Sequence, residues 1–108
     1  MKKIEAYIKS HKLTEVTMAL QHVEGLRGMS VLFARGFGHR DAAEKHPKLD
    51  DLMDFSEHTK IEIFCNDDLV EELVDVIDKN AVTGLRGDGK IYIMDVIGAV
   101  KIGKGKIE

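Results

Sequence analysis

Residues 59–94 read TKIEIFCNDDLVEELVDVIDKNAVTGLRGDGKIYIM, and their pattern is that of a strand, a helix and a second strand. Alternating polar and apolar residues over 59–65 predict a strand. The run 66–68, Asn-Asp-Asp, predicts the N-terminal cap of a helix, with Glu71 completing a capping box. A glycine-containing turn then leads into a second strand over 90–94. The apolar positions of the helix recur every three or four residues: Val70, Leu73, Val74, Ile77 and Ala81.

The N-terminal half has the same order of elements. Residues 3–9 and 29–35 alternate as strands do. Between them Thr14 is the expected N-cap of a helix that stops near Gly25 and Gly28. Its apolar positions are Leu13, Val16, Ala19, Leu20 and Val23. The whole order predicts an α+β, ferredoxin-like βαββαβ sandwich, with two helices on one face of a four-stranded antiparallel sheet.

The other face of this sheet also carries large side chains. Alternation assigns five of them to it: Tyr7, Leu32, Phe64, Tyr92 and Met94. A face with so many large apolar groups is not expected to stay in contact with water. We therefore expect the chain to form an oligomer through this face.

Composition excludes several classes of protein. The 108 residues make one domain, 1–108, and the net charge of −3 gives no electrostatic case for binding nucleic acid. No apolar run approaches the 18 residues of a membrane span, and charges at 2–9 occupy the place of a signal peptide's apolar core. A cytoplasmic location is expected. Cys65, the single cysteine, excludes an internal disulfide and is expected to be a packed thiol.

A long connection separates the second and third strands. Nine of the twenty residues 39–58 are charged and three more are histidines, while Leu49, Leu52, Met53 and Phe55 suit one short helical turn. A loop of about 22 residues in a small domain calls for a functional reason. We expect a flexible arm that becomes ordered on a partner. The alternative is a decorated loop with no partner.

The turn 83–90, Thr-Gly-Leu-Arg-Gly-Asp-Gly-Lys, suits a phosphate. Three glycines allow the backbone to approach a ligand, its N–H groups make an anion-binding nest, and Lys90 adds a positive charge. The order of residues is not that of a Walker A loop. The alternative is a plain turn before a strand.

Short segments along nearly the whole chain carry a family likeness: Met1–Ala6, Lys12–Val16, Gly28–Val31, Gly36–Gly38, Asp54-Phe55, Lys60–Ile63, Asp67-Asp68 and Thr83–Ile91. In this order and spacing the chain resembles the PII signal-transduction (nitrogen-regulatory) family. The resemblance implies a homotrimer that binds ATP, ADP or AMP as an effector in clefts between subunits. It also implies that the long loop, the T-loop of the family, regulates a membrane transporter or a metabolic enzyme.

The resemblance further implies which residues would bind the nucleotide: Tyr7, Gly28, Ser30, Gly36, Phe37, Gly38, Glu62, Phe64, Gly87, Asp88, Gly89, Lys90 and Lys101. Residues 87–90 would lie at the phosphates, and Ser30 near the adenine in place of the family's usual threonine. The residues that would contact a partner are His39, Arg40, His46, Leu49, Leu52 and Met53.

The chain departs from the family pattern at several functional positions. Lys101 and Gly103 stand where two phosphate-clamping arginines are usual, which predicts weaker phosphate binding or a preference for ADP or AMP. Arg40 replaces a glutamine that helps to hold Mg²⁺, and His58 replaces a lysine that meets 2-oxoglutarate. Because arginine cannot ligate a cation, the usual 2-oxoglutarate response is not expected. The loop contains no tyrosine for uridylylation.

The sequence also bears on two other functions, metal response and catalysis. His39, His46 and His58 make the loop rich in metal ligands, so a trimeric metal-responsive protein is the alternative. Their spacing matches no compact metal site, and a solvated charged loop is preferred. Catalysis is not expected, because no serine or cysteine has an evident base, and no catalytic cofactor is implied. The identity of the partner, the preferred nucleotide and any second effector such as bicarbonate stay open.

Overall fold

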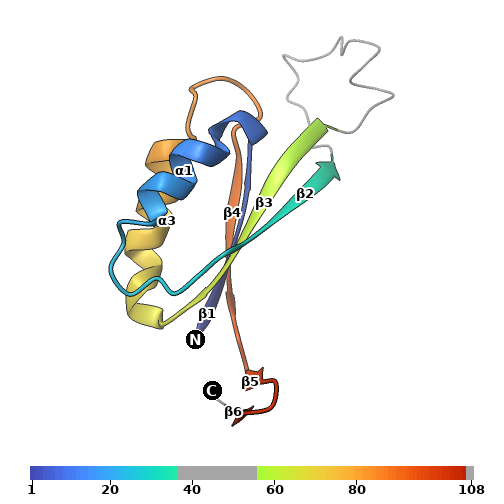
Figure 1. The fold of residues 1–108 in the computed structure, drawn as a ribbon. Coiled ribbons are helices and arrows are strands. Elements are labelled where there is room, and N and C mark those ends of the chain that lie inside the picture. Colours follow the sequence, from blue (N-terminus) through green and yellow to red (C-terminus); the bar gives the residue numbers. More distant parts are fainter. Residues whose placement is uncertain (37–55, 107–108) are drawn as a thin grey trace.

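The computed structural model describes residues 1–36 and 56–106 (Figure 1). Its elements follow in order: β1 (Lys2–Ile8), the 3₁₀ turn η1 (Ser10–Lys12), α1 (Leu13–Leu20), β2 (Ser30–Gly36), β3 (Ser56–Cys65), the 3₁₀ turn η3 (Asp67–Leu69), α3 (Val70–Ala81), β4 (Gly89–Asp95), β5 (Val100–Lys101) and β6 (Gly105–Lys106). The first six strands and helices confirm the predicted βαββαβ order. The predicted α+β, ferredoxin-like fold is therefore the observed one.

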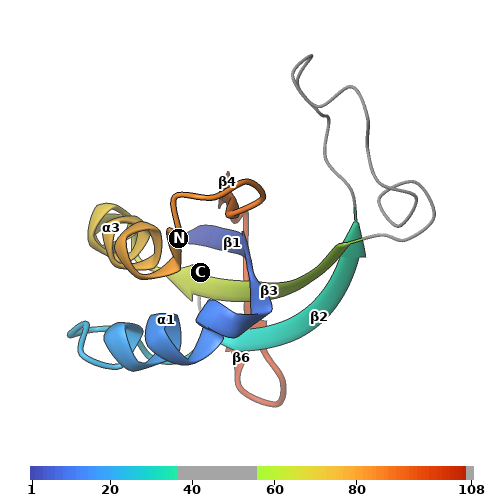
Figure 2. The ribbon, with the colours of Figure 1, turned by 90° about the horizontal axis from the view of Figure 1, so that it is seen from above.

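The four long strands form one antiparallel sheet in the order β2-β3-β1-β4. Strands β1 and β3 are central, and β2 and β4 are the two edges. Both helices lie on the same side of this sheet (Figures 1 and 2). The other side, which we call the open face, is not covered by any helix of residues 1–36 and 56–106.

The core lies between the helices and the sheet. Alternate residues of β1 and β3, among them Ile4, Ile8 and Ile63, are fully buried against Leu73 and Ile77 of α3. Thr59 is buried among them, and its hydroxyl donates a hydrogen bond of 2.9 Å to Ser10. The helical and strand periodicities of the sequence therefore identified the core correctly. Cys65 is buried at the end of β3, as predicted, and this burial raises the pKa of its thiol.

The predicted side-chain caps of both helices were wrong. Helix α1 begins at Leu13, so Thr14 lies inside its first turn, and Asn66 makes no capping side-chain bond. A 3₁₀ turn runs directly into each helix instead. The Leu13 N–H donates to the Ser10 carbonyl and the Leu69 N–H to the Asn66 carbonyl, so the backbone itself satisfies groups that a cap would serve. Glu71 still lies in the first turn of α3, where a negative charge suits the helix dipole.

All four predicted strands differ from the observed strands by one to three residues at one or both ends. Strand β2, predicted over 29–35, runs one residue later, from Ser30 to Gly36. Strand β1 runs one residue earlier than predicted, and β4 gains one residue at each end. Strand β3 begins at Ser56 rather than at residue 59, because residues 56–58 pair with β2 out to Gly36. The predicted loop 39–58 therefore overlaps β3 at its C-terminal end, and its remainder lies outside the described residues.

A small hairpin of β5 and β6 follows β4 and lies apart from the main sheet (Figure 1). The segment from β4 to this hairpin exposes three branched apolar side chains: Ile97, Val100 and Ile102. Among the described residues, no helix is long and apolar enough to cross a membrane.

Candidate functional site

The turn between α3 and β4 is built by positive backbone angles at three glycines. The φ angles of Gly84, Gly87 and Gly89 are 81°, 76° and 116°. Residues other than glycine rarely adopt such φ angles, so the sequence Gly-x-x-Gly-x-Gly is what allows this turn. It ends at the edge strand β4, and Lys90 is the second residue of that strand.

Gly89 is also required by its surroundings. A Cβ atom on Gly89 would lie 1.7 Å from the backbone oxygen of Tyr7. Gly89 pairs with Ile8 across the β1–β4 ladder, so the two strands come together at this point without room for a side chain. The close approach fixes where the turn sits relative to β1.

The carboxylate of Asp88 closes the turn from inside. One oxygen accepts hydrogen bonds from the N–H groups of Thr83 (2.9 Å) and Gly84 (3.1 Å), and the other accepts from the Thr83 hydroxyl. The Thr83 oxygen in turn accepts from the Leu85 N–H at 3.1 Å. The first half of the turn therefore spends these N–H groups on its own carboxylate. Residues 87–90 make up the second half of the turn, which these hydrogen bonds to Asp88 do not involve as donors.

A lysine from the end of β1 also reaches this carboxylate. The ammonium of Lys9 lies 3.2 Å from an Asp88 oxygen and donates a hydrogen bond of 3.1 Å to the Thr83 hydroxyl. The hydrogen bonds from Thr83, together with Lys9 and the Gly84 N–H, hold the pKa of Asp88 well below its usual range. The carboxylate of Asp88 is thus ionised, and its negative charge is paired with the ammonium of Lys9. The contribution of Lys9 was not predicted from the sequence, since it depends on a contact between residues 79 positions apart. Thr83 lies only five residues from Asp88, and its contribution was not predicted either.

A cavity of about 330 Å³ opens beside this turn, between α3 and the β1–β4 edge. Four of the predicted nucleotide-binding residues line it: Tyr7, Asp88, Gly89 and Lys90. Its other lining residues come mainly from α3, including Val74 and Ile77, and Val82 directly after the helix also lines it. Helix α3 therefore gives this cavity a largely apolar wall, and Lys90 lies at its edge on β4.

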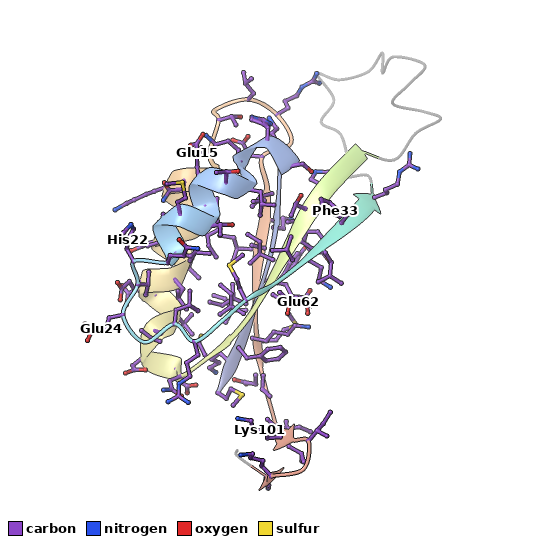
Figure 3. All side chains as sticks on the ribbon, in the orientation of Figure 1. Glu15, His22, Glu24, Phe33, Glu62 and Lys101 are labelled. Atoms are coloured by element: carbon purple, nitrogen blue, oxygen red, sulfur yellow. The ribbon has the colours of Figure 1, made fainter. Side chains whose placement is uncertain are left out.

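Tyr7, Ser30, Glu62 and Phe64 lie on the open face of the sheet. Ser30 pairs with Glu62 across β2 and β3, near the middle of the face, and Phe64 lies two residues further along β3. Figure 3 labels Glu62 and shows it on the side of the sheet away from the helices. All five large side chains assigned to this face from the sequence do lie there, as the register of the strands shows.

A cluster of four charged side chains occupies the centre of the open face. Glu5 and Glu62 pair directly across β1 and β3, where two like charges would repel. Lys3 and Lys60 approach on the two diagonals and contact both carboxylates, at 2.6 and 3.4 Å for Lys3 and at 3.4 and 2.9 Å for Lys60. Hydrogen bonds from the lysines hold the pKa values of both glutamates below the usual range.

This charge cluster was missed by sequence reasoning. Alternation shows that Lys3, Glu5, Lys60 and Glu62 face the same way, but the register of β1 on β3 is what brings them into contact. Each of the two lysines also lies close to an aromatic ring on the same face of the sheet. The Lys3 ammonium lies 5.6 Å from the ring centre of Phe64, and that of Lys60 lies 5.9 Å from Tyr7.

One chain does not bring all the predicted nucleotide-binding residues together. Gly36 ends β2, at one edge of the sheet, and Lys90 is the second residue of β4, at the other. With adjacent strands about 4.8 Å apart, three intervals put these edges about 14 Å from each other. Lys101 lies still further away, in the hairpin beyond the opposite end of β4 (Figure 3). Gly28 lies on the segment that leads into β2.

Several predicted residues fall outside the part of the chain that the structure describes. These are Phe37 and Gly38 of the nucleotide-binding set, and the partner-binding set of His39, Arg40, His46, Leu49, Leu52 and Met53. Of the three candidate metal ligands, His58 is described, and it lies in β3 opposite Ala34. Within residues 1–36 and 56–106, no three potential ligands are grouped to hold a metal ion.

Comparison with known proteins gives a consistent result along the chain. The sequence profile of the family "Nitrogen regulatory protein P-II" matches residues 1–106. A nitrogen regulatory protein P-II of Bradyrhizobium diazoefficiens is 47% identical over 107 residues, which cover 98% of this chain and 95% of that protein. Nitrogen regulatory protein P-II of Klebsiella oxytoca and nitrogen regulatory protein P-II 1 of Escherichia coli K12 are each 42% identical, with the same coverage.

The match spans both helices, the four-stranded sheet and the glycine turn, and it agrees with the fold predicted from the pattern of the sequence. The chain therefore belongs to the nitrogen regulatory protein P-II family, whose members are signal-transduction regulators and not enzymes.

Proposed function

We propose that this protein is a trimeric regulator that binds an adenine nucleotide between its subunits and controls a partner through the loop 39–58. The nucleotide would lie between Gly87–Lys90 of one subunit and Gly36–Gly38 with Ser30 of the next. Its binding would change which conformation of the loop is populated, because a ligand shifts an equilibrium only through different contacts in the two states.

The separation of Gly36 and Lys90 on opposite edges of one sheet is the observation that carries this proposal. A site that needs both edges is incomplete in one chain. It becomes complete where the β4 edge of one copy meets the β2 edge of another. The distance of Lys101 from the turn supports the same arrangement, since this residue would also have to come from a neighbouring copy.

Two exposed surfaces support the assembly. The open face carries Leu32, Phe64, Tyr92 and Met94 around the charge cluster, and the segment from β4 to the hairpin exposes further apolar side chains. Such surfaces are typical of faces that associate. The charge cluster can be buried with them because its carboxylates and ammonium groups are already paired.

The site predicts modest affinity for phosphates. Lys90 is a single point charge, and Lys101 and Gly103 replace two planar guanidinium groups. We therefore expect ADP or AMP to compete well with ATP. The partner is expected to be a membrane transporter or a metabolic enzyme that meets the loop in the cytoplasm.

Isothermal titration calorimetry with ATP, ADP, AMP and Zn²⁺ in turn tests the proposal. We expect nucleotide binding in the wild type and a loss of at least about tenfold in affinity in Lys90→Ala, because a charge-assisted contact with phosphate is removed. Lys79→Ala, which removes an exposed lysine in the last turn of α3, is the control. The absence of nucleotide binding at millimolar concentration, together with tight Zn²⁺ binding, would favour the metal-responsive alternative.

The same measurement with 2-oxoglutarate and Mg²⁺ tests the meaning of Arg40 and His58. We expect the affinity for ATP to be the same with and without 2-oxoglutarate and Mg²⁺. The reason is that Arg40 cannot ligate Mg²⁺ as the family's glutamine helps to do, and His58 stands in place of the lysine that meets 2-oxoglutarate. A strong synergy between 2-oxoglutarate and ATP would show that this part of the proposal is wrong.

A further inference from the structure

Three side chains tie the glycine turn to the end of β1: Lys9, Thr83 and Asp88. The Lys9 ammonium contacts both the Asp88 carboxylate and the Thr83 hydroxyl, at 3.2 and 3.1 Å. The Lys9 side chain also passes beneath Gly87, where its Cε would lie 4.0 Å from a Cβ. Lys9 itself is held by the sheet, since it directly follows β1 and its carbonyl accepts a hydrogen bond of 2.9 Å from the Lys12 N–H.

We propose that Lys9, Thr83 and Asp88 form a clasp that positions the turn for the phosphates of the nucleotide, with Lys9 and Thr83 as positioning residues. This inference rests on the proposed nucleotide site. In this inference the carboxylate of Asp88 holds the turn together and does not contact the ligand. The backbone of residues 87–89 and the ammonium of Lys90 are left to meet the phosphates.

The charges in the turn explain why the clasp is needed. A carboxylate beside a phosphate site would repel the ligand. Here the negative charge of Asp88 is paired with Lys9 and accepts hydrogen bonds from two backbone N–H groups and one hydroxyl. The neutralised carboxylate can therefore shape the turn without opposing a polyphosphate. Other charged groups nearby are Lys90 on β4 and Asp78 on α3, both of which line the same cavity, and Arg86 within the turn.

The structural part of the clasp also explains Thr83. Its hydroxyl lies between Asp88 and Lys9 and accepts from the Leu85 N–H, so it fixes both ends of the short segment 83–85. A serine keeps this hydroxyl, whereas a valine keeps the shape and loses it. The two substitutions therefore separate hydrogen bonding from packing.

Nucleotide affinity gives the first test. We expect Lys9→Met to weaken ATP binding about tenfold, because it leaves a paired charge without its partner. The loss should be smaller for AMP, which carries less charge, and Lys9→Met/Asp88→Asn should recover part of it. Thr83→Val should also lose affinity, whereas Thr83→Ser should stay close to the wild type. Lys12→Met is the matched control, since Lys12 pairs with Glu15 instead.

A spectroscopic test does not depend on the ligand. The Gly84 N–H donates to Asp88, so its amide resonance in the unliganded protein should follow the protonation of this carboxylate. Because Lys9 helps to lower the pKa of Asp88, Lys9→Met should move the midpoint of this titration to higher pH, and Lys12→Met should not.

The outcomes separate the clasp from the proposed function. If the wild type binds no nucleotide, the proposed function fails, and the inference of a positioning role fails with it even if the Gly84 midpoint moves. If the wild type binds but Lys9→Met and Thr83→Val bind equally well, or the Gly84 midpoint is the same in Lys9→Met, the clasp is wrong while the nucleotide site stands.

Discussion

Single residues decide the shape of the glycine turn. At Gly89 the backbone of β1 and that of β4 approach so closely that the Tyr7 oxygen occupies the place of a side chain. At Gly84 the φ angle is also positive, but no heavy atom among the described residues lies within 4 Å of a Cβ there. Two glycines of the same turn are therefore required for different reasons, one by contact and angle, the other by angle alone.

This difference leads to a prediction for two alanine variants. Gly84→Ala should cost about 1 to 2 kcal/mol of the free energy of unfolding, which is the usual penalty of a left-handed backbone. Gly89→Ala should cost more than about 3 kcal/mol, because it adds an atomic overlap that β1 and β4 must separate to relieve. Urea denaturation at one fixed protein concentration measures both. Equal losses in the two variants would contradict the close approach at Gly89.

At the scale of elements, the helices are held by packing more than by their ends. Both begin through 3₁₀ turns that make no capping side-chain bond at the residue before the turn. Helix α3 compensates with an apolar stripe in which Leu73, Ile77 and Ala81 are buried against the sheet. A helix in a protein gains most of its stability from such an apolar face.

Helix α3 therefore offers a direct test of the core. Leu73→Ala should lower the free energy of unfolding by about 2 to 5 kcal/mol, because it removes a fully buried side chain and leaves a cavity. Asp75→Ala, two residues along on the exposed side, should change it by less than about 0.5 kcal/mol. Chemical denaturation followed by circular dichroism compares them. A small effect of Leu73→Ala would mean that α3 is not packed as described.

At the scale of the whole molecule, the two faces of the sheet differ in whether helices cover them. The helices bury one face, while the open face combines exposed apolar side chains with a charge cluster whose four members are already paired. Paired charges lower the cost of removing such a face from water, and their geometry favours one way of docking. The open face thus has the properties of a specific interface.

Sedimentation analysis of two variants tests this face. Wild-type protein is expected at about three times the 12.1 kDa of one chain. Leu32→Glu should shift it toward the monomer, because Leu32, 43% exposed in one chain, would be buried on assembly. Met18→Glu, on α1 with 60% exposure, should leave the mass unchanged. A monomeric wild type, or an unchanged mass in Leu32→Glu, would remove the support for a site between subunits.

Much of the fold and part of the site were predictable. The apolar spacing of Val70 to Ala81 and the alternation of β1 and β3 identified the core, because burial on one face imposes a period on the sequence. The helix caps were mispredicted, since a polar residue near the start of a helix does not show whether a 3₁₀ turn precedes the helix. The Lys9–Asp88 contact and the charge cluster also required the structure, because the register between distant strands sets them.

The order of the elements, the buried face of each and the importance of the three glycines before β4 can all be read from the sequence, since they follow from local periodicity and backbone freedom. The tertiary structure alone decided which strands are edges. It thereby placed Gly36 and Lys90 on opposite sides of one sheet and joined Lys9 to Asp88 across 79 positions of the chain. The physical reason is that pairing between distant strands leaves no periodic trace in the sequence, whereas burial does.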